Sequence, residues 1–330
     1  MKVAHIQRCP PPGANSIEKL FASIRGELQN LSVDVVLERA PHLSQGIRNR
    51  ILNIRWAGTI GADVLHITGD IHYVSLGTKK RKTILTIHDL EMLNRLKGWR
   101  RSVVKLLWFT IPIKRTRVIT CISKATEQRL LSICRIDEKK IRVIPNLLPK
   151  AFPFSPKSEM VEKPRILFVG TKHNKNLERV AAAIQGMNSS LAIVGKLDET
   201  QRSILAEHRI EYVNFVGIDD QQMENQYRLA DLLCFPSLEE GFGLPIIEAQ
   251  SIGRPVVTSN LSSMPEVAGA GACLVDPYSV ESIRSGINKV VSDSAYRKQL
   301  IEIGHVNQKR FVPAAIASQY LELYREVAAG

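Results

Sequence analysis

Residues 235–250 read Phe-Pro-Ser-Leu-Glu-Glu-Gly-Phe-Gly-Leu-Pro-Ile-Ile-Glu-Ala-Gln. This stretch predicts a strand that ends near Phe235, a polar loop with two glycines, and a helix with Pro245 in its first turn. The start of such a helix presents unpaired backbone N–H groups and the positive end of the helix dipole. The stretch therefore predicts a site for an anion such as a phosphate at the carboxyl end of a strand.

Two carboxylates flank this predicted anion site. Glu240 lies in the loop, and Glu248 lies about one turn into the helix. Carboxylates accept hydrogen bonds from hydroxyl groups, and a nucleotide-sugar offers both a phosphate and hydroxyls. The alternative is that Glu240 caps the helix in solvent and Glu248 lies on the surface. The glycines and the proline in register with them favour the binding site.

Two further strand ends carry basic residues. The first is Phe-Val-Gly-Thr-Lys-His-Asn-Lys-Asn at 168–176, and the second is Val-Gly-Lys at 194–196. A glycine allows a tight turn after a strand, and lysines reach a diphosphate. The candidate donor-binding residues here are Gly170, Lys172, Lys175 and Lys196. The alternative for 168–176 is a basic loop with a helix cap at Asn174 or Asn176.

The remaining pattern predicts an α/β fold with two doubly wound domains. Short β-branched runs alternate with longer amphipathic runs in both halves of the chain. We expect strands at 3–7, 33–37, 64–67, 83–87, 117–120, 141–144, 166–169, 191–194, 212–215, 232–235, 255–258 and 273–275. We expect helices at 16–28, 124–133, 176–186, 199–208, 220–229, 244–251, 280–292 and 313–328, with further helical stretches filling the gaps of the first half.

A proline-rich stretch divides these two series of elements. We expect a first domain over 1–148, a linker over 149–164, a second domain over 165–312, and a C-terminal helix over 313–330 that is free to cross back to the first domain. Two such domains enclose a cleft, and open α/β sheets bind ligands outside the carboxyl ends of their strands.

Charge is concentrated in the first half of the 330-residue chain. Residues 1–150 hold 27 of the 45 Lys and Arg but only 11 of the 32 Asp and Glu, so their net charge is +16. The rest of the chain carries 18 basic and 21 acidic residues, or −3, which gives the whole chain its net charge of +13. The excess peaks between Lys79 and Arg117, and over 99–113 it is interleaved with aromatic and aliphatic side chains. The charge favours binding to a polyanion or to an anionic membrane surface, and the interleaved apolar residues are typical of a membrane-interfacial element. The alternative for the apolar residues is a core helix with a basic outer face.

Composition excludes several classes of protein. The chain is 44% hydrophobic and 23% charged, which is typical of globular proteins. The longest strongly apolar stretch, 103–113, is too short to span a membrane. Five scattered cysteines without a Cys-x-x-Cys pair argue against a zinc ribbon or a disulfide framework, and with no secretory signal in view we expect a cytoplasmic protein.

The first domain offers fewer candidates. His88 follows a predicted strand in the run Thr-Ile-His-Asp-Leu, so it is placed to line the cleft. Gly13, in the loop after the first strand, is a second candidate for donor binding. We expect His5, His66 and His72 to include structural histidines.

Residues 235–276 resemble the donor-binding half of the retaining family 4 glycosyltransferases, which have the GT-B fold. The hallmark is Glu-x7-Glu, here Glu240 and Glu248, and the match includes Gly-Phe-Gly-Leu-Pro, the Ala249 to Val257 run and Pro-Glu-Val at 265–267. Weaker agreement extends from 119 to about 278. The first hundred residues agree mainly through the run around His88.

The resemblance implies that the first domain, 1–148, binds the acceptor and that the second domain, 165–312, binds the nucleotide-sugar donor. It also implies roles for the candidate residues. Glu240 would contact hydroxyls of the donor sugar, Glu248 would contact the ribose, and His88 would lie near the reacting carbon. Lys175 and Lys196 would meet the diphosphate. The backbone amides of the loop and helix start would meet the sugar or diphosphate; these are the amides of Phe242, Gly243 and Leu244.

The resemblance also implies the reaction. Family members retain the anomeric configuration, and the leaving phosphate helps to deprotonate the acceptor, so no dedicated nucleophile, metal or cofactor is needed. The chain departs from the family where many members carry arginine, because Asn174 and Thr171 stand at those positions. In the loop after the first strand, family members often carry a pair of glycines, whereas this chain has only Gly13.

We therefore predict a glycosyltransferase that moves a sugar from a nucleotide-sugar, with GDP-mannose favoured over a UDP-sugar, to a lipid-linked glycan. It would act in cell-surface polysaccharide synthesis at the inner face of the cytoplasmic membrane and bind no nucleic acid. The alternatives are an inactive GT-B partner subunit, a sugar-nucleotide epimerase or hydrolase, and a nucleic-acid-binding regulator.

Overall fold

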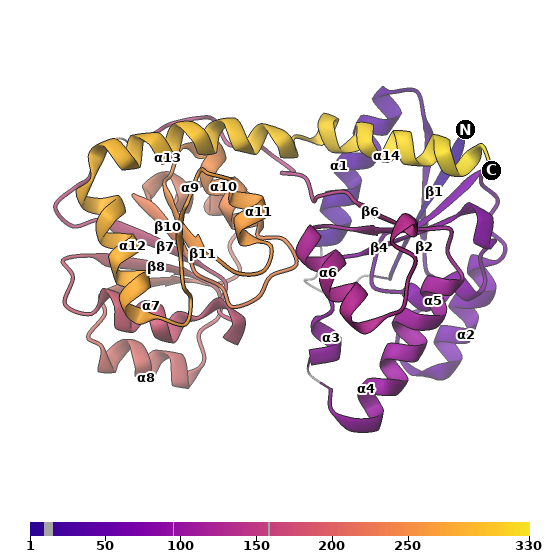
Figure 1. Cartoon of the computed structure of the whole chain (residues 1–330), viewed down its shortest axis with the longest axis horizontal. Helices are drawn as coiled ribbons and strands as arrows, with labels where there is room; N and C mark the ends of the chain where they lie inside the picture. Colours follow the sequence, from indigo (N-terminus) through magenta and orange to yellow (C-terminus); the bar gives the residue numbers. More distant parts are fainter. Residues whose placement is uncertain (10–15, 95, 158) are drawn as a thin grey trace. The chain divides into compact units, whose positions relative to one another are not determined.

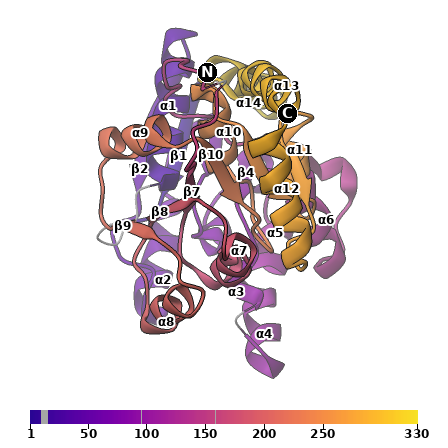
Figure 2. The ribbon, with the colours of Figure 1, turned by 90° about the vertical axis from the view of Figure 1, so that its left-hand side faces the viewer.

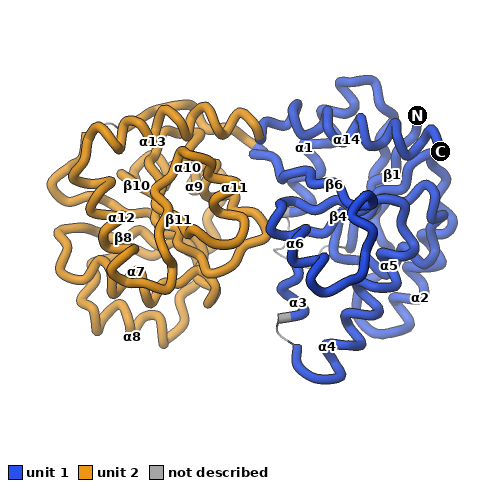
Figure 3. The backbone as a smooth tube through the Cα atoms, viewed as in Figure 1, with its two compact units in different colours: residues 1–149, 311–330 blue, residues 150–310 orange. Residues whose placement is uncertain are grey.

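The computed structural model describes residues 1–9, 16–94, 96–157 and 159–330 (Figure 1). The chain forms two compact units (Figure 3). Unit 1 comprises Met1–Pro149 and Phe311–Gly330, and unit 2 comprises Lys150–Arg310. Each unit contains a parallel six-stranded sheet covered by helices, which confirms the predicted α/β class.

The sheet of unit 1 has the order β2-β1-β3-β4-β5-β6. Its strands are β1 (Lys2–Gln7), β2 (Asp34–Arg39), β3 (Val64–Ile67), β4 (Thr83–Ile87), β5 (Val118–Cys121) and β6 (Ile141–Val143). All six lie within about two residues of the predicted ranges, because each is a short run with β-branched residues. The four inner strands are buried on both faces, whereas the edge strands β2 and β6 are only partly buried.

Two helices cover one face of this sheet, and shorter helices cover the other. The first pair is α1 (Ser16–Asn30) and α14 (Pro313–Ala328), which pack side by side (Figure 1). The others are α2 (Gly46–Ala57), α3 (Glu91–Asn94), α4 (Gly98–Val104), a π-helical turn (Lys105–Thr110), α5 (Ile111–Lys114) and α6 (Lys124–Ile133). The C-terminal helix therefore belongs to unit 1.

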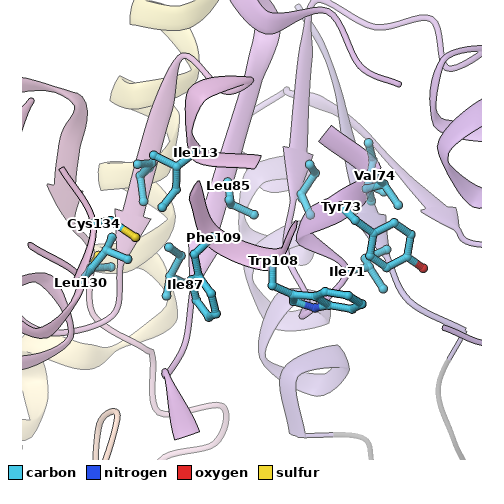
Figure 4. Packing of buried hydrophobic residues seen from close by; sticks show 14 of the residues in the cluster. Ile71, Tyr73, Val74, Leu85, Ile87, Trp108, Phe109, Ile113, Leu130 and Cys134 are labelled. Atoms are coloured by element: carbon cyan, nitrogen blue, oxygen red, sulfur yellow. The ribbon is translucent and has the colours of Figure 1, made fainter. Parts of the chain in front are cut away.

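The hydrophobic core of unit 1 follows the alternation of its strands. Val3 packs under α1 and α14, whereas Ala4 and Ile6 face the opposite layer. Figure 4 shows part of that layer around Trp108 and Phe109, which lie over Leu85 and Ile87 of β4. Both faces of the sheet are therefore covered by packed side chains, so a ligand can reach unit 1 only at its strand ends or at its outer helices.

The sheet of unit 2 has the order β12-β11-β10-β7-β8-β9. Its strands are β7 (Arg165–Val169), β8 (Ser190–Val194), β9 (Tyr212–Phe215), β10 (Leu232–Phe235), β11 (Val256–Ser259) and β12 (Cys273–Val275). Its helices are α7 (Leu177–Ile184), α8 (Glu199–Glu207), α9 (Asp220–Leu229), α10 (Leu244–Ile252), α11 (Met264–Ala268), α12 (Val280–Ser292) and α13 (Ser294–Asn307).

From residue 150 onward the expected linker belongs to unit 2 and makes specific contacts with it, although most of its described residues are exposed. Lys157 forms an ion pair of 3.1 Å with Asp231, and the ring of Phe154 stacks at 4.0 Å on His305. Helix α13 was not among the helices predicted for this half, although Asp293 caps it by accepting a hydrogen bond from the Tyr296 amide. The prolines of the segment mark the absence of regular structure rather than the absence of contacts.

Candidate functional site

The site in unit 2 is positioned by the order of the strands. Connections run in opposite directions on the two sides of the β7–β10 pair, and ligands of open α/β sheets bind at such a switch point, outside the carboxyl ends. Strand β7 ends at Val169 and β10 ends at Phe235. The basic loop and the carboxylate loop identified in the sequence follow these two strands directly.

Lys175 and Glu240 connect the two loops. The Nζ atom of Lys175 lies 2.7 Å from Oε1 of Glu240, and both side chains are about 15% exposed. The same ammonium lies 4.5 Å from the centre of the Phe235 ring, where a cation–π contact adds to the attraction. An ion pair that is mostly shielded from water is screened little by salt, so the lysine is held in place beside the carboxylate.

Gly170 makes room for this lysine. Its φ is +89°, and a Cβ atom there would lie 2.8 Å from Cε of Lys175. The lysine stem therefore folds back across the strand end over bare backbone. This close approach is the physical reason for a glycine after β7.

Asn174 and Thr171, which stand where many family members carry arginine, both make structural bonds. The Nδ2 atom of Asn174 donates to the Glu239 carbonyl at 2.8 Å and to Oε1 of Glu240 at 3.2 Å. The hydroxyl of Thr171 donates to the Lys196 carbonyl at 2.7 Å. These residues fix the loops that carry the charged groups, without supplying the fork of donors that an arginine would bring.

Asn176 ties further loops together. Its backbone is left-handed with φ +71°, and its side chain is buried. Its Nδ2 atom donates to the carbonyls of Pro236 at 3.1 Å and Pro277 at 2.7 Å. Asn176 lies at the N-cap position of α7 but makes no side-chain cap bond, so the capping interpretation of this residue was wrong.

Helix α10 begins as the sequence predicts. Gly243 holds φ at +115° at the N-cap position, and Pro245 lies in the first turn. The preceding loop is fixed by Ser263, whose hydroxyl bonds the Phe242 carbonyl at 2.6 Å and the Glu240 carbonyl at 3.1 Å. The helix start is thus held beside Glu240, and the positive end of the helix dipole lies next to that carboxylate.

Glu248 lies on α10 and accepts a short hydrogen bond. The hydroxyl of Tyr227, a fully buried residue of α9, lies 2.5 Å from Oε2 of Glu248. Burial raises the pKa of Glu248, and the bond from Tyr227 acts in the opposite direction. No hydrogen bond of Oε1 occurs among the described residues, so that oxygen is open to a ligand hydroxyl.

Lys172 and Lys196 are placed differently from Lys175. Both are exposed. Lys172 lines a pocket of about 210 Å³ between the starts of α7 and α8, which it shares with His173, Arg179 and Asp198. The loop after β7 thus sends one lysine to Glu240 and the other to a separate pocket.

The candidates of the first domain lie in unit 1. His88 follows β4, and its Nε2 atom bonds the Thr68 carbonyl at 2.9 Å. Burial lowers the pKa of His88, so the imidazole is neutral at pH 7. Gly13 lies outside the described residues. His5 and His66 bond the hydroxyl of a buried tyrosine of α14, so they are structural, as expected.

Sequence reasoning missed three kinds of supporting residue, namely Tyr227 under Glu248, Asn176 between the loops, and Ser262 and Ser263 behind Glu240. Nothing in the local pattern marks Tyr227, which lies 21 residues before its partner. The serines stand in the run Ser-Asn-Leu-Ser-Ser-Met-Pro after β11, where a turn is predictable but its partner is not.

Among the described residues, no three His, Cys, Asp or Glu side chains are grouped so that they could hold a metal ion. No described helix combines the length and the apolar character that crossing a membrane requires.

Comparison with known families assigns both halves of the chain. Residues 18–149 match the family model "Glycosyltransferase Family 4", and residues 152–306 match "Glycosyl transferases group 1". The two matched ranges coincide closely with the main segments of units 1 and 2.

Two curated relatives are mannosyltransferases. The O-antigen chain mannosyltransferase B of Escherichia coli is 34% identical over 115 residues, which are 34% of this chain and 30% of that protein. The MMP alpha-(1->4)-mannosyltransferase of Mycolicibacterium hassiacum is 25% identical over 70% of this chain and 60% of its own length. The matched stretches thus span about a third to three fifths of these relatives.

The sucrose-phosphate synthase of Thermosynechococcus elongatus superposes over 100% of this chain and 99% of its own, with a TM-score of 0.79 and 17% identity. That likeness shows the fold, which is GT-B. With both family models matched in succession, the chain belongs to the GT-B glycosyltransferases, with a family 4 domain followed by a group 1 domain.

Proposed function

We propose that this protein transfers a sugar from a nucleotide-sugar to a glycan acceptor, and that unit 2 binds the donor. The observation that carries the proposal is the Lys175–Glu240 pair beside the start of α10, at the switch point of the sheet. A cation and the positive end of a helix suit the diphosphate, and carboxylates suit hydroxyls. A nucleotide-sugar contains both kinds of group.

Each candidate then has a role. Lys175 and Lys196 bind the diphosphate, with the amides of Phe242, Gly243 and Leu244 at the helix start. Glu240 binds hydroxyls of the donor sugar through the oxygen that Lys175 leaves open. Glu248 binds the ribose through Oε1, while Tyr227 holds Oε2. His88 lies near the reacting carbon, and Gly13 and Gly170 belong to the donor site, Gly170 by making room for Lys175. Lys172 lines the neighbouring pocket and contributes less to the binding of the diphosphate.

We propose that the reaction retains the anomeric configuration. The bond from the sugar carbon to the leaving phosphate breaks while the acceptor oxygen attacks the same face, and the acceptor proton passes to the departing phosphate oxygen. The products are the glycoside and a nucleoside diphosphate. Because Lys175 and the helix start stabilise the leaving charge, the step needs no metal and no cofactor. Equal anomeric configuration of donor and product, read by NMR, tests retention.

We propose GDP-mannose as the donor, because the relatives reported above are mannosyltransferases. A UDP-sugar is the second candidate, because the residues named so far are assigned to the sugar, the ribose and the diphosphate, and none of them is assigned to the base that distinguishes GDP from UDP. The acceptor is proposed to be a lipid-linked glycan of a cell-surface polysaccharide.

A lipid-linked acceptor requires contact with the membrane, and α4 offers a surface for it. Trp99 is 72% exposed, and Leu106 and Leu107 are 48% and 44% exposed, next to exposed Arg100 and Arg101. Figures 1 and 2 show α4 at the tip of a projection from unit 1. Apolar side chains among arginines suit the boundary of an anionic bilayer, so we propose peripheral attachment to the inner face of the cytoplasmic membrane.

The π-helical turn explains why only part of this segment is exposed. Trp108 and Phe109 are buried although Leu106 and Leu107 are not, and Trp108 donates from Nε1 to the Asp70 carbonyl at 3.0 Å. Arg50 of α2 lies 4.6 Å from the centre of the Trp108 ring. The alternative of a core helix therefore holds for the end of the segment, where Trp108, Phe109 and Ile113 are buried, and these residues anchor the exposed part.

A thermal-shift screen against GDP, UDP, dTDP, ADP and CMP tests the donor site. A nucleotide at about 100 times its dissociation constant should stabilise the protein by roughly 2.7 kcal/mol. The shift should be lost in Glu248→Ala and kept in Glu207→Ala, a control on the exposed face of α8. No shift with any nucleotide would move the interpretation to an inactive partner subunit, and donor turnover without an acceptor would favour a hydrolase or epimerase.

A further inference from the structure

The segment through which the chain enters unit 2, residues 150–157, is fixed to the ends of two helices. Arg254, which is 2% exposed, donates to the Ser155 carbonyl and, at 2.8 Å, to the Arg228 carbonyl in the last turn of α9. The Ser155 amide donates at 3.1 Å to the carbonyl of Ile252, the last residue of α10. The segment is therefore held at the carboxyl ends of α9 and α10, the helices that carry the tyrosine and the buried carboxylate of the candidate site.

Phe152, a half-buried residue of this segment, packs its ring on Tyr227. The two ring centres lie 5.5 Å apart and the ring planes meet at 39°, which is within the range of favourable aromatic pairs. The hydroxyl of the fully buried Tyr227 donates the bond to Oε2 of Glu248. A tyrosine turns only about two side-chain bonds, so the place of its hydroxyl depends on what packs against its ring. Phe152 thus acts on one oxygen of Glu248 through the ring of Tyr227.

The backbone of Phe152 leads to the same glutamate by a second route. Its amide donates a long hydrogen bond of 3.4 Å to Oγ of Ser251, and the Ser251 hydroxyl donates to the Glu248 carbonyl at 2.8 Å. Ser251 is 1% exposed, so water does not compete for these bonds. The side chain and the amide of one residue outside the candidate site therefore both connect to Glu248.

A second phenylalanine of the segment provides the comparison. The ring of Phe154 stacks on His305 of α13, a helix that carries none of the candidate site residues. Phe154 therefore anchors the segment without contact to the support of the carboxylate, whereas Phe152 contacts the residue that fixes Glu248. The two phenylalanines separate anchoring of the segment from support of the site.

We infer that Phe152 is a positioning residue for the nucleotide: it holds Tyr227 in place and, through the Tyr227 hydroxyl, sets the direction in which Glu248 presents its open oxygen. The inference rests on the proposed function, in which Glu248 binds the ribose. Linkage makes the effect reciprocal, so a bound nucleotide stabilises the packed position of Phe152 by the same factor by which Phe152 strengthens nucleotide binding. Occupation of the donor site is thereby registered in the segment 150–157, where the chain enters unit 2.

The first measurement is the affinity of the full chain for GDP by titration calorimetry, with UDP used if GDP does not bind. An aromatic pair contributes enough that Phe152→Ala should raise the dissociation constant by about twofold to tenfold. Phe154→Ala, the matched control, should change it less than twofold. Phe152→Leu keeps most of the apolar volume and should give an intermediate value, so it replaces the alanine variant if that variant does not fold. Equal effects of the Phe152 and Phe154 variants would overturn the inference.

A double-mutant cycle with Tyr227→Phe shows whether Phe152 acts through the tyrosine hydroxyl. The bond to Glu248 is already absent in Tyr227→Phe, so adding Phe152→Ala there should change the dissociation constant less than twofold. A purely structural role of Phe152 would not depend on that hydroxyl. An effect of Phe152→Ala that is undiminished in the Tyr227→Phe background therefore also overturns the inference.

Amide hydrogen exchange, observed by NMR, measures the reciprocal effect. The amides of Phe152 and Ser155 both donate to α10, so saturating GDP should slow their exchange in the wild type. The slowing at Ser155 should be lost in Phe152→Ala and kept in Phe154→Ala. Nucleotide binding without any slowing at these amides would leave the donor function standing and overturn the inference alone. A wild type that binds no nucleotide would reject the donor function, and the inference with it.

Discussion

The hydroxyl of Tyr227 lies 2.5 Å from Oε2 of Glu248 and fixes that carboxylate by donating a hydrogen bond to it. Burial, with the nearby Glu248 charge as the second cause, raises the pKa of Tyr227 well above its usual value of 10. The phenol is therefore always the donor in this bond at physiological pH. The consequence is a carboxylate with one oxygen fixed by the protein and the other presented to a ligand.

Replacing Tyr227 by phenylalanine should weaken nucleotide binding without unfolding the protein. A hydrogen bond to a charged group contributes about 1.5–3 kcal/mol, so the dissociation constant should rise by about tenfold or more. Titration calorimetry with the nucleotide identified in the screen measures this change. Tyr212→Phe, a partly buried tyrosine of β9, is the control, and equal losses in both variants would contradict the role of Tyr227.

The raised pKa of Glu248 predicts a pH-dependent affinity. Burial is the main cause of the shift away from 4.5, so protonation begins at a higher pH than for a free glutamate. The neutral acid is a poorer acceptor for ribose hydroxyls, and affinity should fall as the pH is lowered toward that pKa. Glu248→Gln should bind more weakly and lose this pH dependence. A titration series from neutral to acidic pH decides, and parallel curves for both proteins would refute the assignment.

The sequence predicted the arrangement of the candidate site for some residues and not for others. It predicted that Glu240, Lys175 and Gly170 lie at one edge, and the structure brings them together there, because the ends of parallel strands meet at the same edge. The bond from Tyr227 was not found, because it depends on how α9 packs against α10. The sequence also did not show that Lys172 and Lys175, only three residues apart, lie in different surroundings.

The fold was more predictable than the details of its helices. Strands such as β7 and β10 are apolar runs buried on both faces, and their composition alone defines them. The short helices α3 and α5 have four residues each, so no periodic pattern can identify them. The π-helical turn at Lys105–Thr110 is a matter of packing around Trp108, which no composition shows.

The two lysines of the loop provide a direct comparison. Lys175→Met should weaken the binding of the nucleoside diphosphate by tenfold or more, because the ammonium is shielded from water and its charge is little screened. Lys172→Met should change it only a few-fold, since that side chain is exposed and lines another pocket. Calorimetry at low and moderate salt measures both. The opposite ranking would assign the diphosphate to the 210 Å³ pocket instead.

Trp99 should govern membrane binding. Flotation with vesicles that contain anionic phospholipid should recover the wild type, and recovery should fall with salt because basic side chains contribute to it. Trp99→Ser should reduce recovery several-fold, whereas Tyr278→Ser should not, although that residue of unit 2 is 60% exposed. Recovery that is unaffected by Trp99→Ser would exclude α4 as the attachment surface.

A buried polar row connects the C-terminal helix to the unit 1 sheet. The hydroxyl of Tyr324, on α14, lies 2.8 Å from Nε2 of His5 and 2.6 Å from Nδ1 of His66. The other nitrogen of His66 bonds Thr86 at 2.7 Å. Burial lowers the pKa of His66 to about 3 and that of His5 well below 6.5, so both rings are neutral in the folded state.

Unit 1 should therefore be sensitive to mild acid. The unfolded chain binds protons at these histidines below about pH 6.5 and the folded chain does not, so stability falls with pH from 6.5 downward. At pH 5.5 each buried histidine should cost about 1.4 kcal/mol of unfolding free energy. Urea unfolding at pH 7.5 and 5.5 measures the loss. In His66→Gln the loss of unfolding free energy between pH 7.5 and 5.5 should be smaller by about the contribution of one histidine. In His173→Gln, where the replaced residue is exposed in unit 2, the loss should equal that of the wild type. Equal losses in all three proteins would disprove this explanation.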